Sequence, residues 1–112
     1  MKNLQVVIAF LLLASYGNAQ NILFTEALGT PFEGAWNGKV AFGDFDNDND
    51  NDCIITGLNN SGVMTTQLFE NNGVGVFSLV PNTPFDAAWG GKVSFIDVNG
   101  DNNLDVLIAG DS

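Results

Sequence analysis

The chain repeats itself with a fixed spacing of 53 residues, and this feature constrains its fold more than any other. Residues 83–97 repeat the Thr-Pro-Phe, Trp and Gly-Lys-Val pattern of residues 30–44. The same offset pairs Trp36 with Trp89, and it needs no gap from Phe24 to the end of the chain. Repeats at a fixed period are typical of proteins that stack one small structural unit on another. We therefore expect a duplicated unit.

Within one unit the apolar residues alternate as they do in β-strands. Val40 and Phe42 alternate with small residues, as do their counterparts Val93 and Phe95. Short β-branched runs of buried character follow at residues 53–56 and 106–109. Three further strands are predicted, and they lie at residues 22–28, 64–70 and 77–80. The Asn- and Gly-rich residues 71–75 predict a turn.

One unit is thus predicted to be four short antiparallel strands, which is the size of a β-propeller blade. No helical period is found outside the first residues, so the fold class is all-β. Residues 20–112 hold about one and a half repeats, whereas propellers close with about four to eight blades. We expect an incomplete propeller, either a piece of a longer protein with further blades or a chain that self-associates.

The N-terminus predicts a signal peptide over residues 1–19. Lys2 precedes an apolar run at residues 4–14, and Gly17 and Ala19 are spaced as a cleavage site. The run is shorter than the roughly 20 residues of a membrane span. We expect bacterial export, a secreted or cell-surface location and no membrane span after cleavage. Cys53 then has no partner for an internal disulfide and is interpreted as a small core residue.

The predicted mature chain is strongly acidic. Without Lys2, two lysines face thirteen acids, which gives a net charge of −11. Nucleic acids and anionic membranes are bound through basic patches, so neither is expected as a partner. A surface of this sign attracts cations.

Nine acidic and amide-rich residues, 44–52, form the first candidate metal loop. Carboxylates at its positions 1, 3, 5 and 9 are the predicted side-chain ligands, and they are Asp44, Asp46, Asp48 and Asp52. Asp50, at position 7, is expected to offer its backbone carbonyl, and Asn49 is expected to make the sharp turn at position 6. Ca²⁺ takes six to eight oxygen ligands in irregular geometry, so it is the predicted ion.

The second loop, residues 97–105, repeats this plan 53 residues later. Its predicted side-chain ligands are Asp97, Asn99, Asp101 and Asp105. Asn103 is expected to offer a carbonyl at position 7. Three carboxylates replace the five of the first loop, so we expect weaker Ca²⁺ binding here.

The residues of both loops disfavour an EF-hand, a zinc site and a magnesium site. An EF-hand needs a Glu at position 12, where this chain has Ile55 and Ile108. Zn²⁺ is disfavoured because the chain has no His, and Mg²⁺ because it prefers strict octahedral geometry. Ordinary solvated Asp/Asn turns remain an alternative, although the recurrence of the spacing and the density of like charges favour a metal.

The motif Phe-Gly-Asp-Phe-Asp-Asn-Asp at residues 42–48, followed by Asp52 and by the Phe-Glu-Asn-Asn-Gly run from residue 69, resembles the FG-GAP/VCBS-type repeat. The resemblance implies calcium-bearing blades of an integrin-α-like β-propeller. It also implies a large exported protein, often associated with the cell surface and with adhesion or carbohydrate handling. The chain departs from the family pattern at Asn49 and Asn102, where Gly is usual, and at Asn99.

No catalytic constellation is expected. The chain lacks His, and Glu33 and Asp86 recur with the repeat, which favours a structural role for both. Trp36 and Trp89 are expected to pack within or between units. Two functions remain open: a Ca²⁺-dependent adhesion module that binds a surface glycan or a protein, and a scaffold whose Ca²⁺ only rigidifies blades attached to a catalytic or sorting domain.

Overall fold

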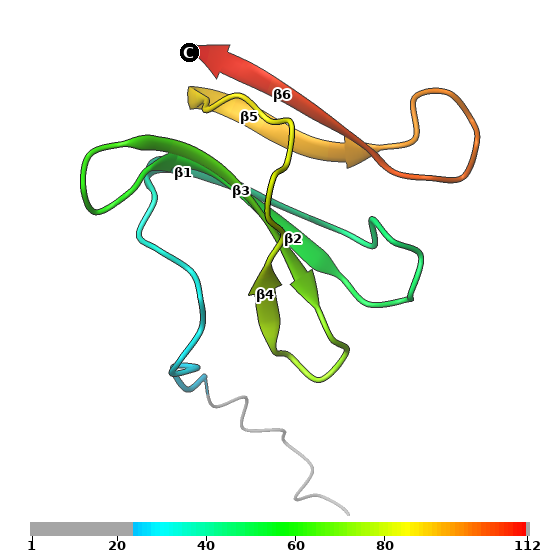
Figure 1. The fold of residues 1–112 in the computed structure, drawn as a ribbon, viewed down its shortest axis with the longest axis horizontal. Helices are drawn as coiled ribbons and strands as arrows, with labels where there is room; N and C mark the ends of the chain where they lie inside the picture. Colours follow the sequence, from blue (N-terminus) through cyan, green and yellow to red (C-terminus); the bar gives the residue numbers. More distant parts are fainter. Residues whose placement is uncertain (1–23, 112) are drawn as a thin grey trace, which may run out of the picture.

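The computed structural model describes residues 24–111, so the predicted signal peptide lies outside the described residues. Six strands are present, and their bounds are β1 (Trp36–Gly43), β2 (Asp52–Leu58), β3 (Met64–Asn71), β4 (Phe77–Leu79), β5 (Trp89–Ile96) and β6 (Asp105–Asp111). Residues 24–111 contain no helix, and hence none that could cross a membrane. The predicted all-β class is confirmed (Figure 1).

The strands form two antiparallel sheets. The first sheet contains β1, β2, β3 and β4 in chain order, and the second contains β5 and β6. This is one four-stranded unit and the first half of another, consistent with incomplete propeller blades. The turn predicted at residues 71–75 joins β3 to β4.

The repeat extends to the hydrogen-bonding register. Val40 pairs with Ile55 across β1 and β2, and Val93 pairs with Ile108 across β5 and β6. Both hairpins also carry a register shift at the same place, just after the tryptophan that opens the first strand. The 53-residue offset therefore relates backbone as well as sequence.

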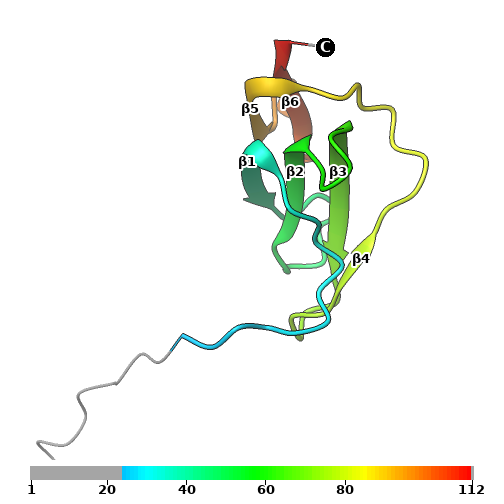
Figure 2. The same cartoon turned by 90° about the vertical axis from the view of Figure 1, so that its left-hand side faces the viewer.

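The core lies where the two sheets meet and where one loop crosses the first sheet. β5 packs against β1 and β2, as the view in Figure 2 also shows. Cys53 and Ile54 of β2 are buried, which confirms the predicted core role of Cys53. On the other face of the first sheet, the ring of Phe32 meets Phe69 edge-on and tilts against Phe77, with centroids 5.0 Å apart in each pair.

Two predictions about the apolar segments were wrong. Residues 24–28 form no strand, and Phe24 and Leu28 are exposed, because no strand edge in the described part of the chain pairs with them. The run at residues 106–109 forms a strand but is not fully buried: Leu107 is exposed. Its outward face lacks a covering sheet among the described residues.

Trp36 and Trp89 stack on each other, with ring centroids 6.3 Å apart and planes at 22°. The contact joins the two units, as the repeat predicts. Trp36 nevertheless remains exposed. The pair lies at the start of β1 and β5, the opposite ends of these strands from the acidic loops.

Candidate metal centre

The two acidic loops are the β1–β2 and β5–β6 connections. They project from the same end of their sheets (Figure 1). A hydrogen bond joins them directly: the Asn47 side-chain amide donates to Asn103 Oδ1 at 3.1 Å. Sequence reasoning missed this contact, since strand periodicity says nothing about the distance between two loops.

The first loop brings three of its predicted ligands together. Carboxylate oxygens of Asp44, Asp46 and Asp48 all lie within 4.8 Å of one another. Asp44 is half-buried, whereas Asp46 and Asp48 are exposed. Partial desolvation, and then the neighbouring Asp48 carboxylate, raise the pKa of Asp46. Both effects disfavour the ionised form of Asp46, and the contribution of Asp48 is repulsion between like charges.

Backbone amides hold these carboxylates in place. Asp44 accepts hydrogen bonds from the amides of Asp48 at 3.0 Å and Asn49 at 2.9 Å. Asp48 in turn accepts one from the amide of Asp50 at 2.9 Å. Acidic side chains that bond the backbone two to five residues ahead curl the loop and fix where its oxygens lie.

The side chain of Asp50 leaves this cluster. A Cβ at Gly73, in the β3–β4 turn, would collide with the Asp50 carboxylate, so the two residues are in close contact. The backbone-carbonyl role that the sequence predicts for Asp50 does not require its side chain to lie in the cluster.

Left-handed backbone shapes both loops. Asn49 and Asn102, at position 6, have φ of 72° and 67°, as their residue type predicts. Position 4 is also left-handed: Asn47 has φ of 63° and Gly100 has φ of 79°. Sequence reasoning missed position 4, although an Asn and a Gly at equivalent places are the signal for positive φ.

The second loop has the same hydrogen-bonding plan. Asp97 accepts from the amides of Gly100 at 2.7 Å and Asn102 at 2.8 Å, and Asp101 accepts from Asn103 at 2.8 Å. Asn99 accepts from the Asp101 amide at 2.9 Å and donates to the Asp101 carboxylate at 3.1 Å.

These bonds determine how the second loop ionises. The amide of Asn102, first among several, lowers the pKa of Asp97, and the amide of Asn103 lowers the pKa of Asp101. With Asn99 in place of a carboxylate, like-charge repulsion is smaller than in the first loop. Both carboxylates are therefore held in the ionised form.

The position-9 aspartates, Asp52 and Asp105, stand apart from these clusters. Asp52 is fully buried and accepts hydrogen bonds from the amides of Phe45 at 3.0 Å and Asn71 at 2.8 Å. It thereby ties the loop to β3. Asp105 accepts the equivalent bond from the Val98 amide at 3.1 Å. The link to Asn71 was not predictable from local sequence.

The donor set fits a hard cation. Every predicted ligand atom is a carboxylate, amide or carbonyl oxygen, which Ca²⁺ prefers. Each carboxylate has more lone pairs than the amide bonds use. The loops can therefore present oxygens to an ion while their backbone stays as it is.

Comparisons with known proteins bear on the loops directly. The chain matches the model of the FG-GAP-like repeat over residues 44–108, which begins at the first acidic loop and includes the second. Neither a curated protein nor a solved structure gives a significant match. The matched segment spans more than half of the chain and contains β2 to β5 with most of β6. The chain belongs to the FG-GAP-like repeat family.

Proposed function

We propose that this chain is an exported, calcium-binding repeat module of a surface or ligand-binding protein, with one Ca²⁺ in each acidic loop. The observation that carries the proposal is the convergence of Asp44, Asp46 and Asp48 oxygens within 4.8 Å. Like charges at this spacing repel one another, and a divalent cation converts that repulsion into attraction. The ion would supply charge neutralisation and a fixed loop geometry.

The two loops are proposed to differ in affinity. Three carboxylates converge in the first loop, whereas the equivalent positions of the second loop hold two carboxylates and the neutral donor Asn99. Affinity for Ca²⁺ follows the number of charged ligands. The first loop should therefore fill at the lower calcium concentration.

A binding role is favoured over a catalytic one. The acids outside the loops that recur with the repeat are Glu33 and Asp86, and their recurrence favours an equivalent structural role in each unit over one shared catalytic site. The acidic loops project together from one end of the sheets, and this end is the proposed face for a surface glycan or a protein ligand.

A scaffold role is the second candidate, and a specific observation favours it. Asp52 fastens the first loop to β3, and Asn47 fastens it to the second loop. Ions held in such loops would stiffen the junction between units. In that case ligand binding would belong to other parts of a longer protein.

Calcium titration of the chelator-treated, exported chain by calorimetry tests the proposal. Two ions should bind per chain, and the melting temperature should rise with calcium. Asp48→Asn should abolish the tighter event, and Asp101→Asn should abolish the weaker one. Glu33→Gln, which changes an exposed acid outside both loops, serves as the control. Unchanged binding in both loop variants would refute the proposed sites.

A further inference from the structure

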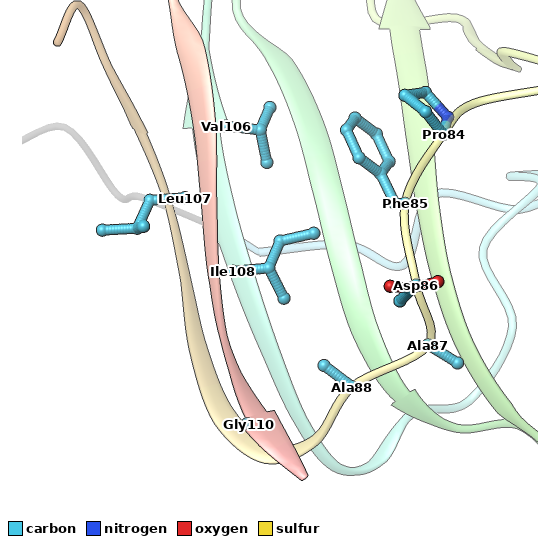
Figure 3. Close-up of a pocket in the computed structure, with 9 residues that line it drawn as sticks. All are labelled: Pro84, Phe85, Asp86, Ala87, Ala88, Val106, Leu107, Ile108 and Gly110. Atoms are coloured by element: carbon cyan, nitrogen blue, oxygen red, sulfur yellow. The ribbon is translucent and has the colours of Figure 1, made fainter. Parts of the chain in front are cut away.

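Each of the two sheets buries one face against the other. In the first sheet, the face that carries Gly43 and Ile54 lies against the hairpin β5–β6, since Gly43 contacts Phe95. In the hairpin, Phe95 and Val106 are paired and therefore share the inward face. Figure 3 shows Val106 pointing inward and Leu107 pointing to the opposite side.

The outward face of the hairpin is the equivalent of a face that is covered in the first unit. Leu107 pairs with Ser94 as Ile54 pairs with Ala41, so Leu107 and Ile54 occupy equivalent positions. Ile54 is 0% exposed, whereas Leu107 is 58% exposed and its neighbour Ile96 is 48% exposed. The covering that Ile54 receives is a sheet of the same repeat, and Leu107 lacks one in residues 24–111.

One position differs sharply between the covered and the open face. Gly43 leaves room for Phe95: a Cβ at Gly43 would lie 2.8 Å from the Phe95 ring and 2.9 Å from its Cβ. The residue equivalent to Gly43 on the open face is Ile96. On the open face, the Ile96 side chain therefore occupies the space that corresponds to the one filled by the Phe95 ring above Gly43.

A second copy of this chain would bring a phenylalanine to that space. Phe42 is the equivalent of Phe95, and it is 62% exposed on the face of the first sheet that points away from β5–β6. Docked as the second unit docks on the first, Phe42 of the second copy would collide with Ile96. Overpacking of this kind forces side chains off their rotamers and shifts the backbone.

We propose that Ile96 makes the outward face of β5–β6 selective: it excludes a second copy of this chain and admits only a sheet of the same repeat type with a small side chain in place of Phe42. The contact between units is head-to-tail, and such contacts extend into filaments when they do not close. Ile96 thus selects the occupant by shape while Leu107 supplies apolar area.

Sedimentation analysis of the exported chain tests this selection. The wild type should keep the mass of one chain across the concentration range. Ile96→Gly and Phe42→Ala each remove one side of the collision, so the weight-average mass of either variant should rise with concentration to two chains or more. Adding Leu107→Asp to either variant should restore the mass of one chain. Adding Val74→Asp, at an exposed turn residue, should not.

Three results would contradict the proposal. If the wild type associates, and if Leu107→Asp abolishes this association, Ile96 does not exclude a second copy. If neither single variant associates while both retain the native circular dichroism, the open face does not receive a sheet. Association of only one variant contradicts the Phe42–Ile96 collision. Glycine weakens strands, but Phe42→Ala is free of that effect. Calcium binding is measured separately and is not presupposed.

Discussion

At the residue scale, Asp52 shows how one side chain serves both a loop and a sheet. It is the most completely buried acid among residues 24–111, and each of its carboxylate oxygens accepts a backbone amide. Hydrogen bonds from amides to a buried carboxylate are stronger than neutral ones, because the acceptor is ionised.

Asp52→Asn replaces one of these acceptor oxygens with an amide nitrogen that faces a backbone N–H. We expect a loss of about 1–3 kcal/mol in the free energy of unfolding, measured by urea denaturation in chelator so that metal does not contribute. Asp105→Asn is the matched control, because Asp105 is only half-buried and accepts the bond from Val98. Equal losses in the two variants would contradict the role assigned to Asp52.

Cys53 should be chemically inert in the folded chain. Burial, and then the nearby Asp52 carboxylate, raise the pKa of the Cys53 thiol to about 11 from 9.0. At about pH 8 the thiolate fraction falls roughly a hundredfold, and only the thiolate is nucleophilic. A thiol reagent should therefore modify Cys53 only after denaturation. Rapid labelling of the native chain would contradict the burial of β2.

At the scale of elements, the second loop should respond to acid. Amide hydrogen bonds lower the pKa of Asp97 and Asp101. These bonds therefore stabilise the loop fully at pH values above the ordinary carboxyl pKa of 3.8. That stabilisation is lost as pH falls through the lowered pKa values. In chelator, the NMR shift of the Gly100 amide, which bonds Asp97, should change below pH 3.8. A midpoint above that value would contradict the hydrogen-bond assignment.

The strands were largely predictable from sequence, because the alternation of apolar residues locates each strand and the 53-residue offset locates its counterpart in the other unit. β2 covers the predicted run at residues 53–56, and Asn49 adopts the left-handed turn expected of it. The strand prediction for residues 24–28 was wrong because a strand also needs a neighbouring strand to pair with, and the local sequence pattern does not reveal one. The Asp52–Asn71 and Asn47–Asn103 bonds join residues far apart in sequence, so they required the fold.

At the scale of the whole molecule, charge should make stability depend on salt. Thirteen acids face three basic residues, and the acidic loops gather several of these charges at one end of the sheets. Self-repulsion destabilises the compact state and is screened by salt. In chelator, sodium chloride should raise the melting temperature; with saturating calcium the increase should be smaller. Equal increases would argue against calcium in the loops.

The identical register of the two hairpins also affects how the chain folds. β3 pairs with β2 through residues whose equivalents recur in β6, so an unfolded chain holds two strands able to compete for one edge. Nearness in sequence favours β2, because closing a short loop costs less entropy than closing a long one. Misassembly between repeats is a common kinetic trap. Because of the duplication, β2 and β6 compete for pairing with β3 during folding, and the shorter loop between β2 and β3 favours the native pair.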